Sequence, residues 1–158
     1  MISHKAIEDL RSLEGLAWIT ALKSAQIRSL VQGGALQLGL FDIVLFMGVL
    51  YHLPDMLRGL HIVRQVCGGV MFLETHADNT AGPELPVARY YRGASLAGDH
   101  TNFWSPNRRC VHDMLFDAGF EVDYDDPAGD RLFVAARAVT MEGLRHEKMR
   151  IAYGTVGS

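Results

Sequence analysis

Hydrophobic and polar residues alternate with two different periods along this chain, and the periods predict its elements. From Lys5 to Lys23, apolar residues recur every three or four positions, which is typical of one face of an amphipathic helix. Residues 27–31 fit a short strand. The run Phe41–Met47 is apolar except for Asp42 and predicts a buried strand that stops at Gly48. The strongest strand signal therefore follows a helix and a weak strand.

A helix and a second strand follow this run. Pro54 suits the first turn of a helix, because a missing N–H costs nothing there. We expect Gly68-Gly69 to end the helix, and Val70–Glu74 is again a near-continuous apolar run. Two buried strands joined by a helix make a right-handed crossover, the unit of a parallel sheet. The helix carries its apolar residues at helical spacing, at Met56, Leu60, Val63 and Cys67.

The next segment breaks this rhythm. Residues 75–103 begin with turn-forming residues and show no clear period, so we expect a long loop that is functional or mobile. Ser105-Pro106 suits the cap and first position of a helix, which Gly119 would end.

A strand pair closes the predicted fold. Residues 120–124 and 131–139 read as antiparallel strands joined by the turn 125–130. The order of elements predicts an α/β fold with a mostly parallel, Rossmann-like sheet and an antiparallel C-terminal hairpin. The length suits one domain over residues 1–139, and we expect the tail 140–158 to form a short helix at most.

Composition narrows the function classes. A net charge of -3 shows no basic excess, so nucleic-acid binding is not indicated. We find no apolar run of about 18 residues that could span a bilayer and no secretory signal, which favours the cytoplasm. Cys67 and Cys110 lack a recognisable spacing and are expected to be reduced. The seven histidines are scattered, so no metal site is expected.

The end of the strand Phe41–Met47 is the expected ligand site, because ligands of open α/β sheets bind beyond the carboxyl ends of strands. We expect Tyr51 to line a pocket there, and His52 either to act as a general base or to orient the loop. His76 follows the second strand at the same edge, as a substrate-side group or a plain loop histidine. Trp104 and its aromatic neighbours either cover a substrate such as a base or pack onto the core. The catalytic residue stays unassigned.

Glu74 and the pair Arg108-Arg109 carry charge at unfavourable positions in the predicted elements. Glu74 stands in an apolar strand, where an isolated carboxylate would be costly, so it must be paired or near water, either facing the cleft or bonding a neighbouring loop. Arg108-Arg109 falls in the first turn of a predicted helix, the unfavourable end for positive charge, which favours a partner for one of the two, although a solvated pair is the commoner outcome.

Three segments together resemble the class I S-adenosylmethionine-dependent methyltransferases. Within that fold they are similar to a subgroup related to the tRNA wobble-uridine carboxymethyltransferases, which use carboxy-S-adenosylmethionine. The likeness covers roughly residues 27–139. The segments are Phe41–Val44 followed by Gly48–Leu53, which resembles the fourth strand and its loop, Leu73–His76, which resembles the fifth strand, and Asn102–Asn107, which resembles the entry to the next helix.

The resemblance implies a cofactor site. Met47, Gly48 and Tyr51 match the positions that line the cofactor pocket, and Arg131 matches an arginine that reaches the site from the last strand. A planar guanidinium can bind both oxygens of a carboxylate, which suits a carboxylated cofactor. The implied cofactor is S-adenosylmethionine or carboxy-S-adenosylmethionine, and the implied acceptor is a tRNA or a small molecule.

The glycine-rich turn that holds the cofactor in this fold has no counterpart in the sequence, since G-x-G-x-x-G does not occur. We therefore expect a truncated domain, with an N-terminal helix over residues 1–26 before the family-like region, and without the N-terminal half that holds the cofactor. The alternative function is a catalytically inactive remnant that acts as an interaction module. Such a remnant would form a homodimer through an exposed sheet edge.

Overall fold

The computed structural model describes residues 40–80, 82–140 and 143–153. The predicted helix over residues 5–23 and strand over residues 27–31 lie outside these residues. The described elements are, in order, β1 (Phe41–Met47), the 3-10 turn η3 (Leu50–His52), α3 (Met56–Val66), β2 (Cys67–His76), β3 (Ala88–Tyr90), β4 (Trp104–Pro106), α4 (Arg108–Ala118), β5 (Phe120–Ala128), β6 (Arg131–Ala138) and α5 (Gly143–Tyr153).

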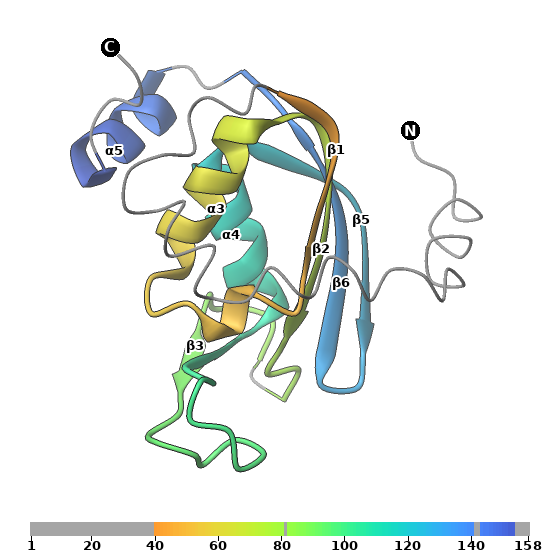
Figure 1. Cartoon of the computed structure of the whole chain (residues 1–158), viewed down its shortest axis with the longest axis vertical. Helices are drawn as coiled ribbons and strands as arrows, with labels where there is room; N and C mark the ends of the chain where they lie inside the picture. The colour runs from red at the N-terminus through yellow and green to blue at the C-terminus, as the bar shows by residue number, and fades with distance from the viewer. Residues whose placement is uncertain (1–39, 81, 141–142, 154–158) are drawn as a thin grey trace.

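Four of the strands form one mixed sheet in the order β1-β2-β6-β5 (Figure 1). β1 and β2 are parallel, and β6 is antiparallel to both of its neighbours, β2 and β5. It follows that β1, β2 and β5 run in one direction and β6 alone runs against them. The predicted α/β fold with an antiparallel C-terminal hairpin is confirmed. The strands of the hairpin do not follow their order in the chain: the later strand, β6, pairs with β2, and the earlier strand, β5, is outermost.

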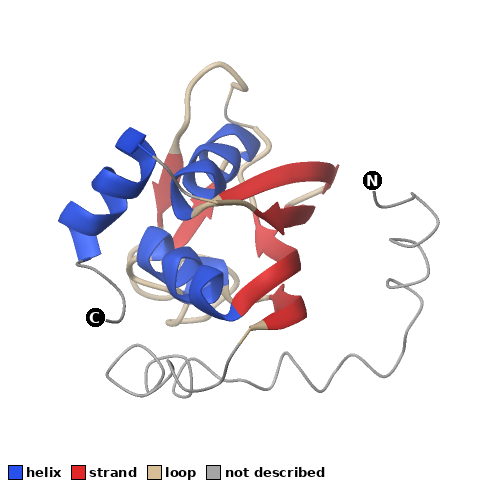
Figure 2. Cartoon of the chain, turned by 90° about the horizontal axis from the view of Figure 1, so that it is seen from above, coloured by secondary structure: helices blue, strands red, loops and turns tan. Residues whose placement is uncertain are grey.

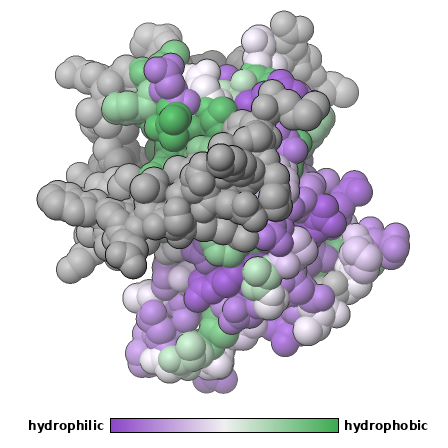
Figure 3. All heavy atoms as spheres, turned by 90° about the vertical axis from the view of Figure 1, so that its right-hand side faces the viewer, coloured by the Kyte–Doolittle hydropathy of each residue, from purple (hydrophilic) through white to green (hydrophobic). Residues whose placement is uncertain are grey.

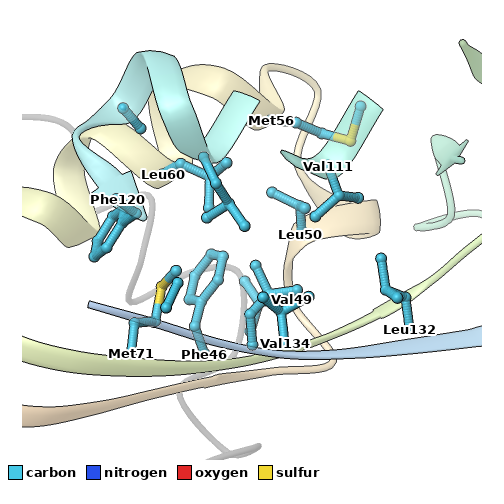
Figure 4. Close-up of a cluster of buried hydrophobic side chains, with 14 of the residues drawn as sticks. Phe46, Val49, Leu50, Met56, Leu60, Met71, Val111, Phe120, Leu132 and Val134 are labelled. Carbon is cyan, nitrogen blue, oxygen red and sulfur yellow. The ribbon is translucent and has the colours of Figure 1, made fainter. Parts of the chain in front are cut away.

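Helices α3 and α4 lie side by side on one face of this sheet (Figures 1 and 2). Every second residue of a strand points to this face, and these residues pack against the apolar faces of both helices. Burying each such large side chain contributes about 2 kcal/mol to stability. The core drawn in Figure 4 includes Phe46, Leu50, Leu60, Met71, Val111, Phe120, Leu132 and Val134, and all of them are buried.

The boundary between α3 and β2 differs from the prediction. The helix ends at Val66, and Gly68-Gly69 lies inside strand β2 rather than between the two elements. A Cβ on Gly69 would lie 2.2 Å from the carbonyl oxygen of Asp42. Glycine is therefore needed for the close approach of β1 and β2, so a pattern that resembles a helix stop has a packing cause.

Both helix starts also lie further along than predicted. Asp55 is the N-cap of α3 and accepts a hydrogen bond from the backbone N–H of Arg58. Asn107 is the N-cap of α4, whereas Ser105 and Pro106 belong to β4. Each side-chain oxygen accepts a hydrogen bond from a first-turn backbone N–H, of Arg58 or of Cys110, that has no partner within its helix.

Three further differences concern loops. Residues 75–103 contain β3, which pairs with β4 to form a short antiparallel ribbon. The hairpin turn shrinks to Gly129 and Asp130, because β5 continues to Ala128. Gly129 adopts a positive φ of 61°, which suits a two-residue hairpin turn. In the tail, α5 agrees with the expected short helix. No helix in the described ranges is long and apolar enough to cross a membrane.

Candidate functional site

The carboxyl ends of β1 and β2 and the start of β6 meet at one edge of the sheet. The β1–β2 register pairs Met47 with Glu74, and the β2–β6 register pairs His76 with Arg131. Directly after β1, the backbone N–H of Gly48 donates to the carbonyl oxygen of Glu74 over 3.0 Å. Sheet pairing alone therefore brings predicted site residues from three separate elements to one place.

Arg131, Glu74 and Tyr51 form a hydrogen-bonded group, which we call the Arg131 cluster. Nη1 of Arg131 donates to Oε1 of Glu74 at 3.1 Å and lies 3.3 Å from the Tyr51 hydroxyl. The guanidinium carbon is 5.4 Å from the centre of the Tyr51 ring, within range of a cation–π contact. The Glu74 side chain is only 13% exposed and that of Arg131 is 39% exposed. A desolvated carboxylate is thus paired with a cation that still reaches solvent.

The charge balance of this edge suits a ligand that carries both signs. Burial alone would lower the pKa of Arg131, but the Tyr51 hydroxyl and the Glu74 carboxylate outweigh it and raise the pKa, so the guanidinium stays charged. Asp130 lies 3.8 Å from Nε of Arg131 and adds a second carboxylate. No partner of Nη2 is found among the described residues, so the fork keeps a donor for a ligand oxygen.

Gly48 opens the backbone next to this cluster. Its φ of 66° is in the left-handed region, which favours glycine. A Cβ at this position would lie 3.6 Å from Oε2 of Glu74 and 3.9 Å from the Tyr51 hydroxyl oxygen. The absent side chain leaves room beside both polar groups, at the strand end where ligands of this sheet type bind.

His76 is held in place on both sides of its ring. Nδ1 is 2.5 Å from the hydroxyl oxygen of Ser105, which is fully buried, and Nε2 is 3.5 Å from a carboxylate oxygen of Asp130. Burial lowers the pKa of His76, although Asp130 acts in the opposite direction. The ring centre lies 6.0 Å from that of Tyr51. His76 therefore joins β2, the ribbon and the hairpin turn next to the cluster.

His52 and Trp104 make more contacts with the β3–β4 ribbon and its neighbouring loops than with the Arg131 cluster. The His52 ring is 4.0 Å from the Tyr51 ring, but its Nδ1 lies 3.0 Å from both the carbonyl and hydroxyl oxygens of Thr101. Trp104 donates from Nε1 to the carbonyl oxygen of Pro54 and packs edge-on against Tyr90. These bonds attach the segment that leads into β4 to the turn that carries Tyr51.

Ser105 and Asp130 were not expected at the site, whereas Glu74 was expected either to face the cleft or to bond a neighbouring loop. For Glu74 a signal existed, because a carboxylate in an apolar strand requires a partner. Its partner, Arg131, lies 57 positions along the chain, a separation that local patterns cannot bridge. No signal pointed to Ser105, which had been interpreted as a helix cap.

A second polar group lies between α4 and β5, and we call it the Asp125 cluster. Both carboxylate oxygens of Asp125 accept from Arg108, one of them from Nη2 at 2.8 Å, and Nε2 of His112 is 2.9 Å from Oδ2. The expected partner for one of the two adjacent arginines is thus Asp125. Burial raises the pKa of Asp125, but hydrogen bonds from Arg108 and His112 outweigh it and hold the pKa below its ordinary value.

Other features carry less chemistry. A cavity of about 240 Å³ lies between the loop after β2, the start of α4 and the end of β5, lined by Asp78, Asn107, Arg108 and Pro127 among others. The described part of the chain contains no group of three or more side chains arranged to hold a metal ion. Cys67 and Cys110 are free, as predicted.

Comparison with known proteins identifies the fold. The sequence matches no protein-family model and no curated protein. The structure is similar to a protein from Listeria monocytogenes described as a putative S-adenosylmethionine dependent methyltransferase, with a TM-score of 0.50 and 10% identity over 70% of this chain and 67% of that chain. At this identity the likeness shows the fold alone, an α/β fold whose mixed sheet agrees with an incomplete Rossmann-like arrangement.

Two Burkholderia thailandensis structures show weaker likeness. An O-methyltransferase family protein has a TM-score of 0.49 and 14% identity over 73% of this chain and 34% of that chain. A 1,6-didemethyltoxoflavin-N1-methyltransferase with bound 1,6-didemethyltoxoflavin and S-adenosylhomocysteine has a TM-score of 0.45 and 16% identity over 63% of this chain and 44% of that chain. The chain therefore spans less than half the length of these two proteins.

Proposed function

We propose that this chain belongs to an S-adenosylmethionine-dependent transferase and that the Arg131 cluster forms one wall of the cofactor pocket. The observation that carries the proposal is the meeting of Gly48, Tyr51, Glu74 and Arg131 at the carboxyl edge of the sheet. This edge is where open α/β sheets bind their ligands. The class I methyltransferase fold supports the same assignment.

The residues present fit this cofactor. Its amino acid part carries an ammonium and a carboxylate, and its sulfonium is a further cation. Glu74 offers a desolvated carboxylate to the cations, and Arg131 offers to the carboxylate its Nη2 donor, which has no partner in the described part of the chain. Met47 and Tyr51 supply apolar surface on either side of Gly48. When bound, the cofactor supplies an activated carbon, so the protein contributes mainly positioning and the exclusion of water.

The finer assignments also belong to this proposal. Arg131 could hold the extra carboxylate of carboxy-S-adenosylmethionine, because its planar fork suits two oxygens and the Tyr51 hydroxyl lies beside it. His76 would face the acceptor from the end of β2. We favour a small-molecule acceptor over tRNA, because a net charge of -3 gives no basic footprint for a polyanion.

Calorimetric titration of the full chain with S-adenosylhomocysteine tests the assignment. We expect binding that Arg131→Leu weakens about tenfold, equivalent to about 1.4 kcal/mol. Arg137→Leu is the matched control, because Arg137 lies on the same strand and pairs with Glu121 and Asp123 away from the site. Equal losses for both variants would contradict a specific role for Arg131.

The same variants separate the two cofactors. If Arg131 holds the extra carboxylate, Arg131→Leu should weaken carboxy-S-adenosylmethionine far more than S-adenosylmethionine. Equal losses would remove the reason for preferring carboxymethyl transfer. No binding of any of these ligands to the folded chain would favour the alternative function, an interaction module without catalysis.

A further inference from the structure

The two ring nitrogens of His76 have different surroundings. The residue is only 9% exposed, and its Nδ1 lies 2.5 Å from the hydroxyl oxygen of Ser105, which is fully buried. Its Nε2 makes no hydrogen bond within the part of the chain that the structure describes, because the carboxylate oxygen of Asp130 that it faces is 3.5 Å away. One nitrogen of a deeply buried ring is therefore satisfied, and the other is directed at an exposed carboxylate beyond hydrogen-bond distance.

The Ser105 hydroxyl determines which nitrogen carries the hydrogen in the neutral ring. A buried hydroxyl needs an acceptor for its hydrogen, and Nδ1 of His76 is the acceptor that the described residues provide. Nδ1 then presents a lone pair, so the hydrogen of the neutral ring is on Nε2. Asp130 favours the same form, because a lone pair on Nε2 would face a negative oxygen. A protonated ring also carries hydrogen on Nε2, so this nitrogen is a donor in both charge states.

Asp130 supplies an acceptor beside this donor. Its backbone carbonyl oxygen accepts from the N–H of Ala77 over 2.9 Å, which holds the hairpin turn against the end of β2. Its side chain is 71% exposed, and one carboxylate oxygen lies 3.8 Å from Nε of Arg131, too far for a hydrogen bond. Among the described residues no group donates a hydrogen bond to this carboxylate. It is thus open to a ligand next to the Arg131 cluster.

The surroundings of His76 and Asp130 suit a polar group carried by a flat ring. The ring centres of Tyr51 and Tyr91 lie 6.0 Å and 6.4 Å from that of His76. Figure 1 places the hairpin turn and the end of β2 in the lower half of the molecule, and Figure 3 shows that the visible face of this half is mostly hydrophilic. The pair therefore combines aromatic neighbours with a polar surface.

We propose that His76 and Asp130 form an acceptor subsite that binds a hydroxyl group on an aromatic ring, with Nε2–H as donor and the carboxylate as acceptor. A hydroxyl both accepts and donates a hydrogen bond, whereas an ammonium group only donates. An oxygen can lie about 2.8 Å from both Nε2 and the Asp130 oxygen across their separation of 3.5 Å. Ser105 is then a positioning residue. The inference rests on the proposed function, because proximity to Arg131 is what makes the bound hydroxyl an acceptor.

Nitrogen NMR of the full wild-type chain with isotope-labelled histidine tests the donor. The His76 signals are assigned through the backbone, and the long-range nitrogen–proton spectrum is recorded at about pH 8, above the ordinary pKa of histidine. We expect the pattern of the Nε2–H form. The pattern of the Nδ1–H form would overturn the proposal, and this measurement depends on no variant.

Small aromatic probes test the ligand class, with and without S-adenosylhomocysteine. Phenol accepts and donates, anisole only accepts, and protonated benzylamine only donates. The backbone amide signals of Asp130 and Arg131 report binding. We expect phenol to bind in the millimolar range, as suits so few atoms, and anisole to bind about fivefold more weakly. Equal affinities for phenol and anisole, tighter binding of benzylamine, or no response to phenol would overturn the subsite.

A pair of variants locates the acceptor. Asp130→Ala should weaken phenol about tenfold, the loss expected for a hydrogen bond to a charged group. Asp113→Ala is the matched control, because Asp113 is a partly exposed carboxylate on α4 that pairs with Arg109, and it should leave phenol binding unchanged. Equal losses in both variants would contradict the assignment of Asp130.

The same titrations separate this inference from the proposed function. Binding of phenol at Asp130 without binding of S-adenosylhomocysteine would support the hydroxyl site and contradict the cofactor wall. Binding of S-adenosylhomocysteine without a preference for phenol would leave the cofactor wall intact and overturn the hydroxyl site.

Discussion

The Arg131 cluster and the Asp125 cluster contain similar groups but use them differently. In the Asp125 cluster, a carboxyl side chain that is only 9% exposed receives bonds on both oxygens from Arg108 and one from His112. In the Arg131 cluster, one nitrogen of the guanidinium serves both Glu74 and Tyr51. The first arrangement is closed and ties α4 to β5. The second leaves Nη2 of Arg131 without a partner among the described residues, beside the open backbone of Gly48, so the comparison separates a structural ion pair from a candidate binding site.

The largest expected effect comes from the closed cluster. Arg108→Ala removes the exposed partner and leaves the largely buried Asp125 carboxylate with only His112, so it should lower the free energy of unfolding by about 2 kcal/mol. Asp125→Ala should cost less, about 1 kcal/mol, because Arg108 can then turn to water. Urea denaturation measures both. Neither variant should change the affinity for S-adenosylhomocysteine. A loss of affinity that accompanies the loss of stability would show that the Asp125 cluster also contributes to binding.

A smaller effect is expected in the open cluster, and on binding rather than folding. Glu74→Gln removes the charge that holds Arg131 and should weaken S-adenosylhomocysteine about tenfold, or about 1.4 kcal/mol. Glu121→Gln is the control, since it removes a carboxylate that pairs with Arg137 on the same strand. Calorimetry checks both. An unchanged affinity in Glu74→Gln would mean that Arg131 needs no partner to act.

Acid should also weaken the Asp125 cluster. Because the pKa of Asp125 in the folded chain lies below its ordinary value of 3.8, its ionised form contributes stability above that pH. This contribution is lost as the pH falls through 3.8 toward the lowered folded value. Asp125→Asn should remove this part of the acid sensitivity, which denaturation between about pH 5 and about pH 2 would detect. An identical pH dependence in both proteins would show that the pair is not formed in solution.

The smallest effect is expected from Tyr51→Phe. This change removes only the hydroxyl next to Arg131 and keeps the ring against the guanidinium, so cofactor affinity should fall by roughly threefold to tenfold. Tyr90→Phe serves as the control, because Tyr90 is exposed on the ribbon. If Tyr51→Phe binds carboxylated and ordinary cofactors with the same change in affinity, the hydroxyl has no role in choosing between them.

Local patterns predicted the elements better than their ends. The positions of the strands and of the two central helices follow from apolar periodicity, which depends only on neighbouring residues. The predicted burial of Phe41–Met47 is wrong, because β1 is an edge strand among the described strands and buries only Phe46. The starts of α3 and α4 could not be placed, because Pro54 and Pro106 resemble first-turn residues while the capping side chains follow them. Gly69 likewise resembles a helix stop, although the carbonyl of Asp42 on another strand explains it.

The candidate site was predicted in part. Tyr51 and Arg131 lie together, as the resemblance to one cofactor site implied. Their functional roles remain predictions. His52 and Trp104 make most of their contacts with the ribbon and its neighbours. Their bonds to Thr101 and Pro54 depend on how the ribbon folds back, which no short-range pattern contains.

The sequence by itself determined the α/β class, the positions of the strands and the edge of the sheet at which a site should form. These follow from hydrophobic periodicity and from turn-forming residues, both of which act over a few positions. The tertiary structure alone decided that β6 lies between β2 and β5, and thereby that Arg131 faces Glu74 and Tyr51. The pairing of β6 with β2 and the ion pair of Arg131 with Glu74 join residues that are far apart in the chain. The free energy of such contacts depends on the burial of the groups and on the distances between them, which are set only when the chain folds. It also showed that the carboxylate of one cluster is fully bonded, while the guanidinium of the other keeps a donor for a ligand.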